Sequence, residues 1–306
     1  MLALRELAQG DLLGSRVIPV VESIKITSTF NGALKAYTEK KYPLALILNP
    51  AVGELSSGAA ISSLLPFING SVIPSAIMGK NTEEVISALS SKDMTTDSML
   101  AIMTNRDFLD IYLKLFDGLP PPKFTLFSDE RRIRHAIKEN KTLFSENKIL
   151  FEDKFKKQEK NADYLKHEDE FYSDDHLYLS EDDFSGFGDY SIIGSEYNEA
   201  GFAPYAVAIH IVYFADDNTL RVRHFVSDSN EDISDAAGKF YEAVMKLKRW
   251  FDDGQSKQLT TALATLLSHA ENGYYPGLPT IKKLSIMHHL ELVGKYLGTL
   301  DGGSGK

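Results

Sequence analysis

Short apolar runs recur through the first half of the chain, and each of them ends at a polar residue. The runs are continuous and do not alternate with polar positions, which is typical of strands buried on both faces, as in a parallel sheet covered by helices. Successive polar exits lie roughly 23 to 30 residues apart, about the length of one strand, one helix and two loops. The pattern therefore predicts a βα repeat with strands at residues 16–21, 44–48, 72–77, 99–103, 124–127 and 148–151.

Amphipathic segments separate these predicted strands. In residues 106–116, RDFLDIYLKLF, apolar side chains recur at the three- and four-residue spacing of a helix. Six such units in succession favour a TIM-like (β/α)8 barrel of the α/β class, because evenly repeated right-handed crossovers curl a sheet one way. An open doubly wound sheet is the alternative. Neither a glycine-rich dinucleotide fingerprint nor a GxxxxGK[ST] loop is present, so nucleotide-binding versions of that fold have no support.

The regular pattern stops after Phe151. Residues 153–183 contain 11 acidic and 5 basic side chains, a net charge of −6, which is typical of a solvated acidic excursion that is helical at first and then irregular. The segment that follows, FSGFGDYSII at residues 184–193, predicts a seventh barrel strand.

The last third of the chain has a different pattern. Residues 205–214 and 220–226 are strong β segments joined by a short loop, which predicts an antiparallel β-hairpin over 205–226. One of its arms is a candidate for the eighth barrel strand. Extra C-terminal helices are expected at about 234–251, 257–270 and 280–297, and the glycine-rich end predicts a flexible tail at 300–306. No sharp boundary interrupts the pattern, so we expect a single barrel-like domain over 1–299.

Composition and charge exclude several classes of protein. The 306 residues contain 33 Lys and Arg against 43 Asp and Glu, and this acidic balance argues against strong nucleic-acid binding, which needs surplus basic side chains. No apolar run is long enough to span a bilayer and the N-terminal stretch lacks the features of a secretory signal, so we expect a cytoplasmic protein with no membrane association. The absence of cysteine excludes disulfides, thiolate metal sites and cysteine nucleophiles.

Ordered blocks spread over nearly the whole chain carry a resemblance to a known family. The blocks are RVIPVVESIK, LALILNPAVGEL, GDYSIIGSEY, HFVSDSNEDISDAAGKFYEA and SIMHHLELV. Together they resemble the Beta-protein family of phage and bacterial genomes. The resemblance implies a TIM-barrel-like protein of unestablished activity with a suspected role in antiviral defence against phage, and it supplies no catalytic residues. Members of the family carry an aromatic, basic segment before the LALREL helix; because this sequence starts MLALREL, we expect either that the segment is missing or that the start has been chosen internally.

In a parallel barrel the functional face lies at the carboxyl ends of the strands. The polar exits that fall there form a ring of carboxylates with one amine and two amides: Glu22, Asn49, Lys80, Asn105, Asp129, Glu130, Glu152, Asp189 and Asp228. Such a ring could bind a divalent cation through oxygen ligands, or divide acid and base roles between two carboxyl groups. Capping of the following helices is the alternative for Asn105, Asp129 and Asp228, because caps need the same residue types.

The candidate catalytic residues are Glu22, Glu152, Asp189, His224 and Asp228. Glu22 is not needed as a cap, and a mouth-facing role and a structural ion pair are equally open for it. His224 lies near a strand end, where a histidine serves as general base, as metal ligand or simply as a packed side chain. Asp189 follows two glycines, which allow either a close approach to a ligand or a tight turn. Ser75 and Ser191 lack a GxSxG context, so serine hydrolysis has no support from sequence.

Two functions stay open at this point. The first is a defence component that acts with a partner protein, such as a nuclease or toxin, and docks it on residues 153–183 or on the hairpin 205–226. The second is a metal-assisted hydrolase that uses the carboxylate-rich mouth on a phosphorylated or glycosidic substrate. The resemblance favours the first, because the residues show no recognised catalytic constellation and a barrel fold does not decide function.

Overall fold

The chain folds into two compact units, each described here by itself. The computed structural model describes residues 1–56, 58–79, 81–140, 144, 147–197, 204–254 and 258–302. Unit 1 comprises Met1, Ile18–Glu152 and Tyr178–Asp189, and unit 2 comprises Leu2–Val17, Asp153–Leu177 and Tyr190–Lys306. The single domain expected over 1–299 stays a prediction.

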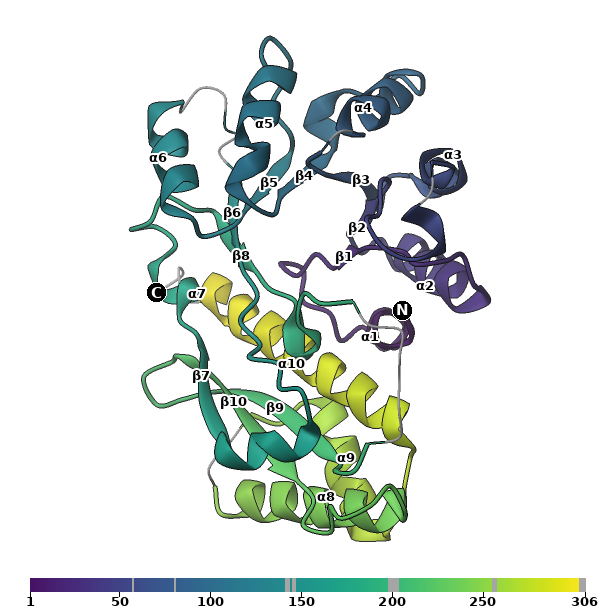
Figure 1. Ribbon diagram of the computed structural model, residues 1–306, viewed down its shortest axis with the longest axis vertical. Helices are drawn as coiled ribbons and strands as arrows, with labels where there is room; N and C mark the ends of the chain where they lie inside the picture. The colour runs from purple at the N-terminus through teal and green to yellow at the C-terminus, as the bar shows by residue number, and fades with distance from the viewer. Residues whose placement is uncertain are drawn as a thin grey trace. The chain divides into compact units, whose positions relative to one another are not determined.

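Unit 1 is built on a curled sheet of seven parallel strands in the order β1-β2-β3-β4-β5-β6-β8 (Figure 1). The six strands expected from the apolar runs and the seventh expected from 184–193 are confirmed. Neighbouring strands pair in regular register, with Leu44 opposite Val72 and Leu100 opposite Phe124. The strand bounds are β1 Val20–Val21, β2 Leu44–Ile47, β3 Val72–Ile77, β4 Leu100–Met103, β5 Phe124–Phe127, β6 Lys148–Phe151 and β8 Gly186–Gly188.

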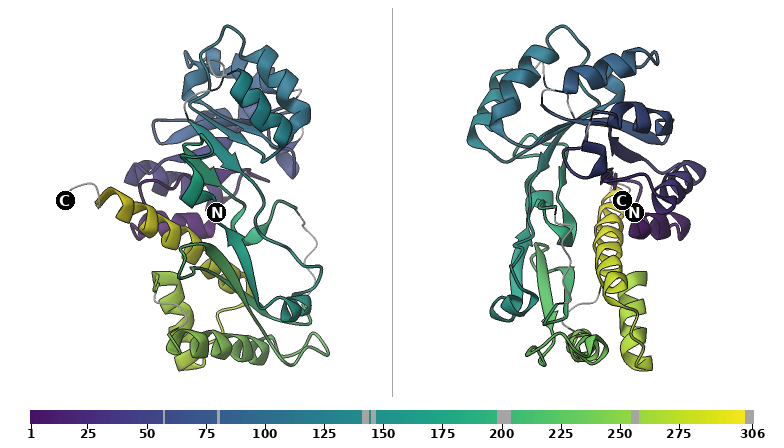
Figure 2. Two further views of the ribbon diagram at one scale, coloured as in Figure 1. Left: turned by 90° about the vertical axis from the view of Figure 1, so that its left-hand side faces the viewer. Right: turned by 45° about the vertical axis from the view of Figure 1, so that its right-hand side comes forward.

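Helices flank this sheet on its outer side, so that the strands form a half-barrel (Figures 1 and 2). They are α2 Ser28–Lys40, α3 Ala60–Leu64, α4 Thr82–Ser90, α5 Leu109–Leu115 and α6 Arg131–Glu139, with 3-10 turns η1 Glu54–Ser56, η2 Leu65–Phe67, η3 Thr96–Ser98 and η4 Arg106–Phe108. The inner face holds an apolar cluster that includes Ile47, Ile102 and Leu126. Burial of the strands on both faces explains why their sequences do not alternate.

Unit 2 contains a separate antiparallel sheet in the order β7-β10-β9, with β7 Asp169–Ser173, β9 Ala208–Phe214 and β10 Leu220–Val226. The hairpin expected over 205–226 is confirmed as β9 and β10, which pair from Ala208 with Val226 to Phe214 with Leu220. The expectation that one of its arms is the eighth barrel strand is wrong, because β9 and β10 both belong to the three-stranded sheet and neither pairs with the parallel one. Among the described residues the parallel sheet therefore ends at β1 and β8, and a closed eight-stranded barrel is not seen.

The acidic excursion 153–183 is more ordered than its composition suggests. It contains η5 Asn161–Lys166, strand β7 and the short helix α7 Asp175–Tyr178. Asp169 at the start of β7 pairs with Arg221 at 2.6 Å and with Arg223 at 3.2 Å on β10. The expectation of a segment that is helical at first and then irregular is thus wrong: residues 153–160 form no helix, and β7 forms in the later half because basic side chains on the neighbouring strand compensate the acidic ones.

Helices complete unit 2: α1 Leu2–Gln9, the 3-10 turn η6 Ser191–Ile193, α8 Ala236–Asp252, α9 Thr261–Asn272 and α10 Leu278–Gly302. Helix α8 begins after Asp235, whose carboxylate accepts the Gly238 N–H at 2.9 Å. Helix α10 continues into the tail expected at 300–306, and residues 303–306 lie outside the described part. None of the described helices is long and apolar enough to cross a membrane.

Candidate functional site

At the carboxyl edge of the parallel sheet, the predicted mouth residues mostly bind neighbouring backbone. One carboxylate oxygen of Glu22 accepts the Ala51 N–H at 2.6 Å, which ties the end of β1 to the loop after β2. Asn49 at the end of β2 uses both ends of its amide on one residue of β3: it accepts the Ile77 N–H at 2.9 Å and donates to the Ile77 carbonyl at 2.8 Å. Both side chains therefore extend the sheet beyond its last backbone hydrogen bond.

The next strand ends show the same use of polar side chains. Asn105 accepts the Asp107 N–H at 2.8 Å, so its expected capping role is confirmed. Glu130 accepts the Arg106 N–H at 3.1 Å and links the exits of β5 and β4. Asp129 is not a cap: it pairs with Arg134 at 2.5 Å, and Asp182 pairs with the same guanidinium at 3.2 Å. The hydrogen bond that Arg134 donates to Asp129 is the main cause of the raised pKa of Arg134.

Glu152 and Asp189 are brought together by the register of the last two strands. Phe151 of β6 lies opposite Gly188 of β8, and the Glu152 N–H donates to the Gly188 carbonyl at 3.2 Å. The two carboxylates therefore follow adjacent strand ends, which are about 5 Å apart in a sheet. Glu152 is exposed and Asp189 half-buried, so both can meet a ligand. Glu22 follows β1, the opposite edge strand of the sheet.

Few side chains at this edge of the sheet are placed to bind a metal ion. Within the described part of the chain, no group of three or more His, Asp or Glu side chains is placed to hold a metal ion. Two carboxylates from Glu152 and Asp189 could supply part of an oxygen shell, with water completing it. Lys80, the amine of the predicted ring, lies outside the described residues.

His224 and Asp228 belong to unit 2, and the structure gives them different partners from those we expected. His224 is buried, and its Nδ1 lies 2.7 Å from Nδ1 of His210 on the paired strand. Its Nε2 lies 3.3 Å from Glu170 of β7. Burial lowers the pKa of His224 to about 4, against the opposing effect of Glu170, and burial also lowers the pKa of His210. The two imidazoles are therefore neutral at pH 7, and one donates to the other.

Asp228 is exposed and forms an ion pair with Lys246 of α8 at 2.7 Å. Its backbone N–H donates to Glu242 at 2.7 Å, and Glu242 also accepts the Ser229 N–H and hydroxyl. The hydroxyl of Ser229 is the main cause of the lowered pKa of Glu242. Asp228 thus fixes the loop after β10 to α8, which is neither the predicted cap nor a partner for His224.

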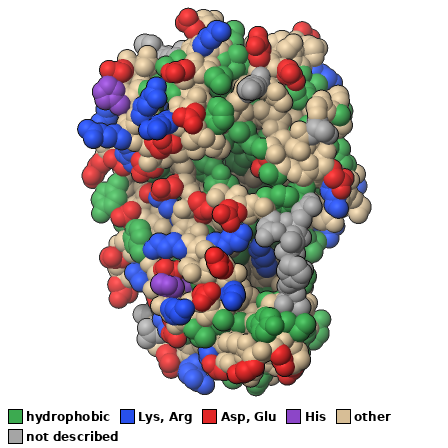
Figure 3. Space-filling model, in the orientation of Figure 1, with side chains coloured by type: hydrophobic (Ala, Val, Ile, Leu, Met, Phe, Trp, Pro, Cys, Tyr) green, Lys and Arg blue, Asp and Glu red, His purple; other side chains and the backbone are tan. Residues whose placement is uncertain are grey.

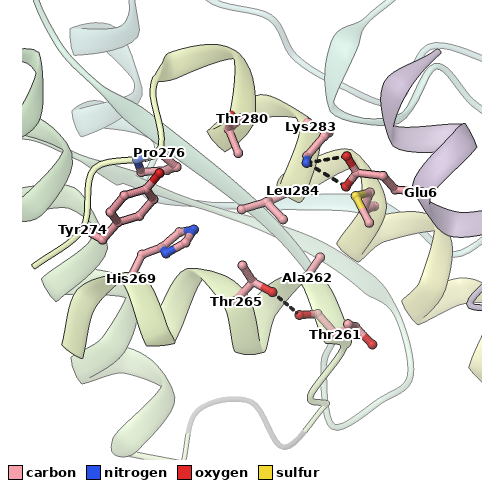
Figure 4. Close-up of a pocket in the computed structure, with 11 residues that line it drawn as sticks. Glu6, Thr261, Ala262, Thr265, His269, Tyr274, Pro276, Thr280, Lys283 and Leu284 are labelled. Carbon is pink, nitrogen blue, oxygen red and sulfur yellow. Dashed lines mark hydrogen bonds and ion pairs between the residues drawn. The ribbon is translucent and has the colours of Figure 1, made fainter. Parts of the chain in front are cut away.

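A cavity of about 440 Å³ between α9 and α10 was not expected from the sequence (Figure 4). Lys283 and Glu6 form an ion pair in it, with Nζ 2.7 and 2.9 Å from the two carboxylate oxygens. His269 faces the ring of Tyr274 at 5.0 Å, and burial followed by the charge of Lys283 lowers the pKa of His269. Glu6 lies far from Lys283 in the sequence, and no local pattern links them. The sequence signalled only the helices that line this cavity, through their periodicity.

A second cavity of about 340 Å³ forms where the acidic excursion, the hairpin and α8 meet. Three basic side chains reach it, from Arg223, Lys246 and Arg249. Arg223 lies 6.0 Å over the ring of Trp250 and pairs with Asp169. Arg249 is exposed and makes no ion pair with any residue that the structure describes. The cavity also has an apolar rim at Leu165, which is 42% exposed.

Comparison of the chain with protein-family models, with curated proteins and with solved structures found no match.

Proposed function

We propose that this protein is a component of antiviral defence that acts with a partner protein, and that it binds the partner at the cavity between the excursion, the hairpin and α8. The resemblance to the Beta-protein family of phage and bacteria supports the defence role. The observation that carries the binding site is the junction itself: Leu165 of the excursion, Arg223 of the hairpin and Arg249 of α8 line one hollow. We also propose that the chain forms the closed barrel that the resemblance implies.

The chemistry of this cavity defines the partner. Arginine and aromatic side chains around an apolar centre are typical of residues that dominate binding energy at protein interfaces. Of the three basic side chains, Arg223 pairs with Asp169 and Lys246 pairs with Asp228, so Arg249 is the one that can meet a carboxylate of the partner. We therefore expect the partner to insert an apolar side chain with a carboxylate beside it. On the face drawn in Figure 3, acidic and basic side chains are intermixed, so net charge alone does not select a partner surface.

The test combines co-purification with phage plaque counts in a host that carries the chain and the neighbouring gene product. Leu165→Glu and Arg249→Glu should each weaken binding of that product at least tenfold, about 1.4 kcal/mol, and reduce protection in parallel. Leu119→Glu is the matched control, because Leu119 has nearly the same exposure, 41%, in unit 1. Unchanged binding in both cavity variants contradicts the proposal.

A metal-assisted hydrolase is the second candidate, and one observation favours it: Glu152 and Asp189 follow adjacent strand ends. Two such carboxylates could bind a divalent cation that activates water for attack on a phosphate ester. The double variant Glu152→Gln with Asp189→Asn separates the two candidates. Loss of protection with partner binding intact supports the hydrolase, whereas full protection excludes it.

A further inference from the structure

A serine and a histidine in unit 2 form a pair that the sites above do not use. Ser191 opens η6, and its Oγ lies 3.0 Å from Nδ1 of His289 in α10. We propose that Ser191 is a nucleophile and His289 its general base, in a site that transfers the acyl group of a carboxylic ester. The two residues are 98 positions apart, so no local serine motif could reveal the pair.

His289 is placed as a base would need to be. Its side chain is buried, only 4% exposed, and its ring meets the ring of Tyr172 edge-on with centroids 5.2 Å apart. Packing thus fixes the direction in which Nδ1 points. In the tautomer that carries hydrogen on Nε2, Nδ1 accepts the hydroxyl hydrogen of Ser191, which is the first contact in serine activation.

The backbone conformation and the partial burial of Ser191 are those expected of a nucleophile. Its φ of +52° lies in the left-handed region, which non-glycine residues rarely adopt and which recurs where function requires strain. Ser191 is only partly buried, whereas His289 is buried. A glycine would remove the strain at this position, yet the chain has a side chain with a hydroxyl there.

Ser191 and His289 can hydrolyse an ester with water as the only other reactant. Oγ of Ser191 attacks the carbonyl carbon as its proton passes to Nδ1 of His289. The bond to the alcohol then breaks, and His289 returns the proton to the leaving oxygen. Water attacks the acyl-serine by the same route, with His289 as base, which releases the carboxylic acid and restores the hydroxyl.

The first experiment treats the full chain with a fluorophosphonate probe, which forms a serine–phosphorus bond and releases fluoride. Mass spectrometry should locate the adduct on Ser191. The adduct should disappear in Ser191→Ala, fall at least tenfold in His289→Gln, and persist in Ser90→Ala, a control at an exposed helix serine whose hydroxyl binds a backbone carbonyl.

The second experiment uses the absence of cysteine from the chain. Ser191→Cys introduces a single thiol, and His289 should stabilise its thiolate, so that iodoacetamide alkylates it at pH 6.5 at least tenfold faster than the thiol of Ser90→Cys. Adding His289→Gln should abolish the difference. Fluorescence of the single tryptophan, Trp250 in unit 2, verifies folding of each variant. No adduct on Ser191, or equal alkylation rates in the folded variants, overturns the proposal.

Discussion

His288 makes the stability of unit 2 sensitive to acid. Its Nε2 lies 2.7 Å from the Val212 carbonyl and must donate to it, so in the neutral ring Nδ1 accepts from Thr260, also at 2.7 Å. Thr260 in turn accepts the Leu263 N–H at the start of α9. Protonation of His288 places a second hydrogen between Nδ1 and Thr260, so it disrupts the contact that joins α10, α9 and β9.

The magnitude follows from the pKa. Burial lowers the pKa of His288 from 6.5 to about 4, so the unfolded chain binds a proton more tightly than the folded one. Stability is therefore full above pH 6.5 and is lost as the pH falls toward 4. The linkage gives a loss of about 1 kcal/mol at pH 5.5 and about 2 to 3 kcal/mol at pH 4.5 from this side chain alone.

Urea unfolding followed by Trp250 fluorescence at pH 7.5, 5.5 and 4.5 measures this effect in the correct unit, because Trp250 is the single tryptophan and lies in α8. His288→Gln should be less stable than the wild type at pH 7.5 but should lose about 2 to 3 kcal/mol less on acidification to pH 4.5. The exposed His135→Gln serves as control and should retain the wild-type pH dependence. Equal pH dependence in His288→Gln and wild type refutes the reasoning.

Three further substitutions test contacts within one unit. Asn49→Ala removes both hydrogen bonds to Ile77 and should lower the unfolding free energy of unit 1 by about 1 to 3 kcal/mol in urea titrations followed by circular dichroism. Glu291→Ala removes a fully buried carboxylate that accepts the Thr261 N–H, so α9 should exchange its N-terminal amide hydrogens at least tenfold faster. Gly294→Ala places a Cβ 2.9 Å from the backbone nitrogen of Gly14 and should lower the melting temperature of unit 2, whereas Gly298→Ala, with open space around it, should not.

The parallel strands could be predicted because burial on both faces leaves a signal inside each strand. Strand β7 could not, since two of the five residues of DEFYS are acidic and the segment becomes a strand only when Arg221 and Arg223 lie beside it. Those arginines follow Asp169 by more than 50 positions, and no local pattern shows such a pairing. The expected eighth barrel strand was wrong for a related reason, because the unrecognised strand β7 joins the hairpin in a separate sheet.

The sequence could predict those residues of the candidate site that follow the ends of parallel strands. Glu152 and Asp189 were expected at neighbouring exits, and the register brings them there. The partner of His224 was missed although a signal existed: a hairpin centred on residues 215–219 places His210 directly opposite His224. Glu170 completes that cluster from β7, so the part supplied by the unrecognised strand could not have been found.

The acidity of residues 153–183 now has a structural explanation that changes the expected partner. Asp169 is compensated by arginines of β10, so part of the net charge of −6 serves to hold the excursion against the hairpin. Carboxylates used in this way attract a basic partner only weakly, because surface ion pairs and solvent screen them further. The cavity beside them instead exposes Arg249 next to the apolar Leu165. A partner that recognises this place by charge must therefore be acidic, although the chain as a whole is acidic too.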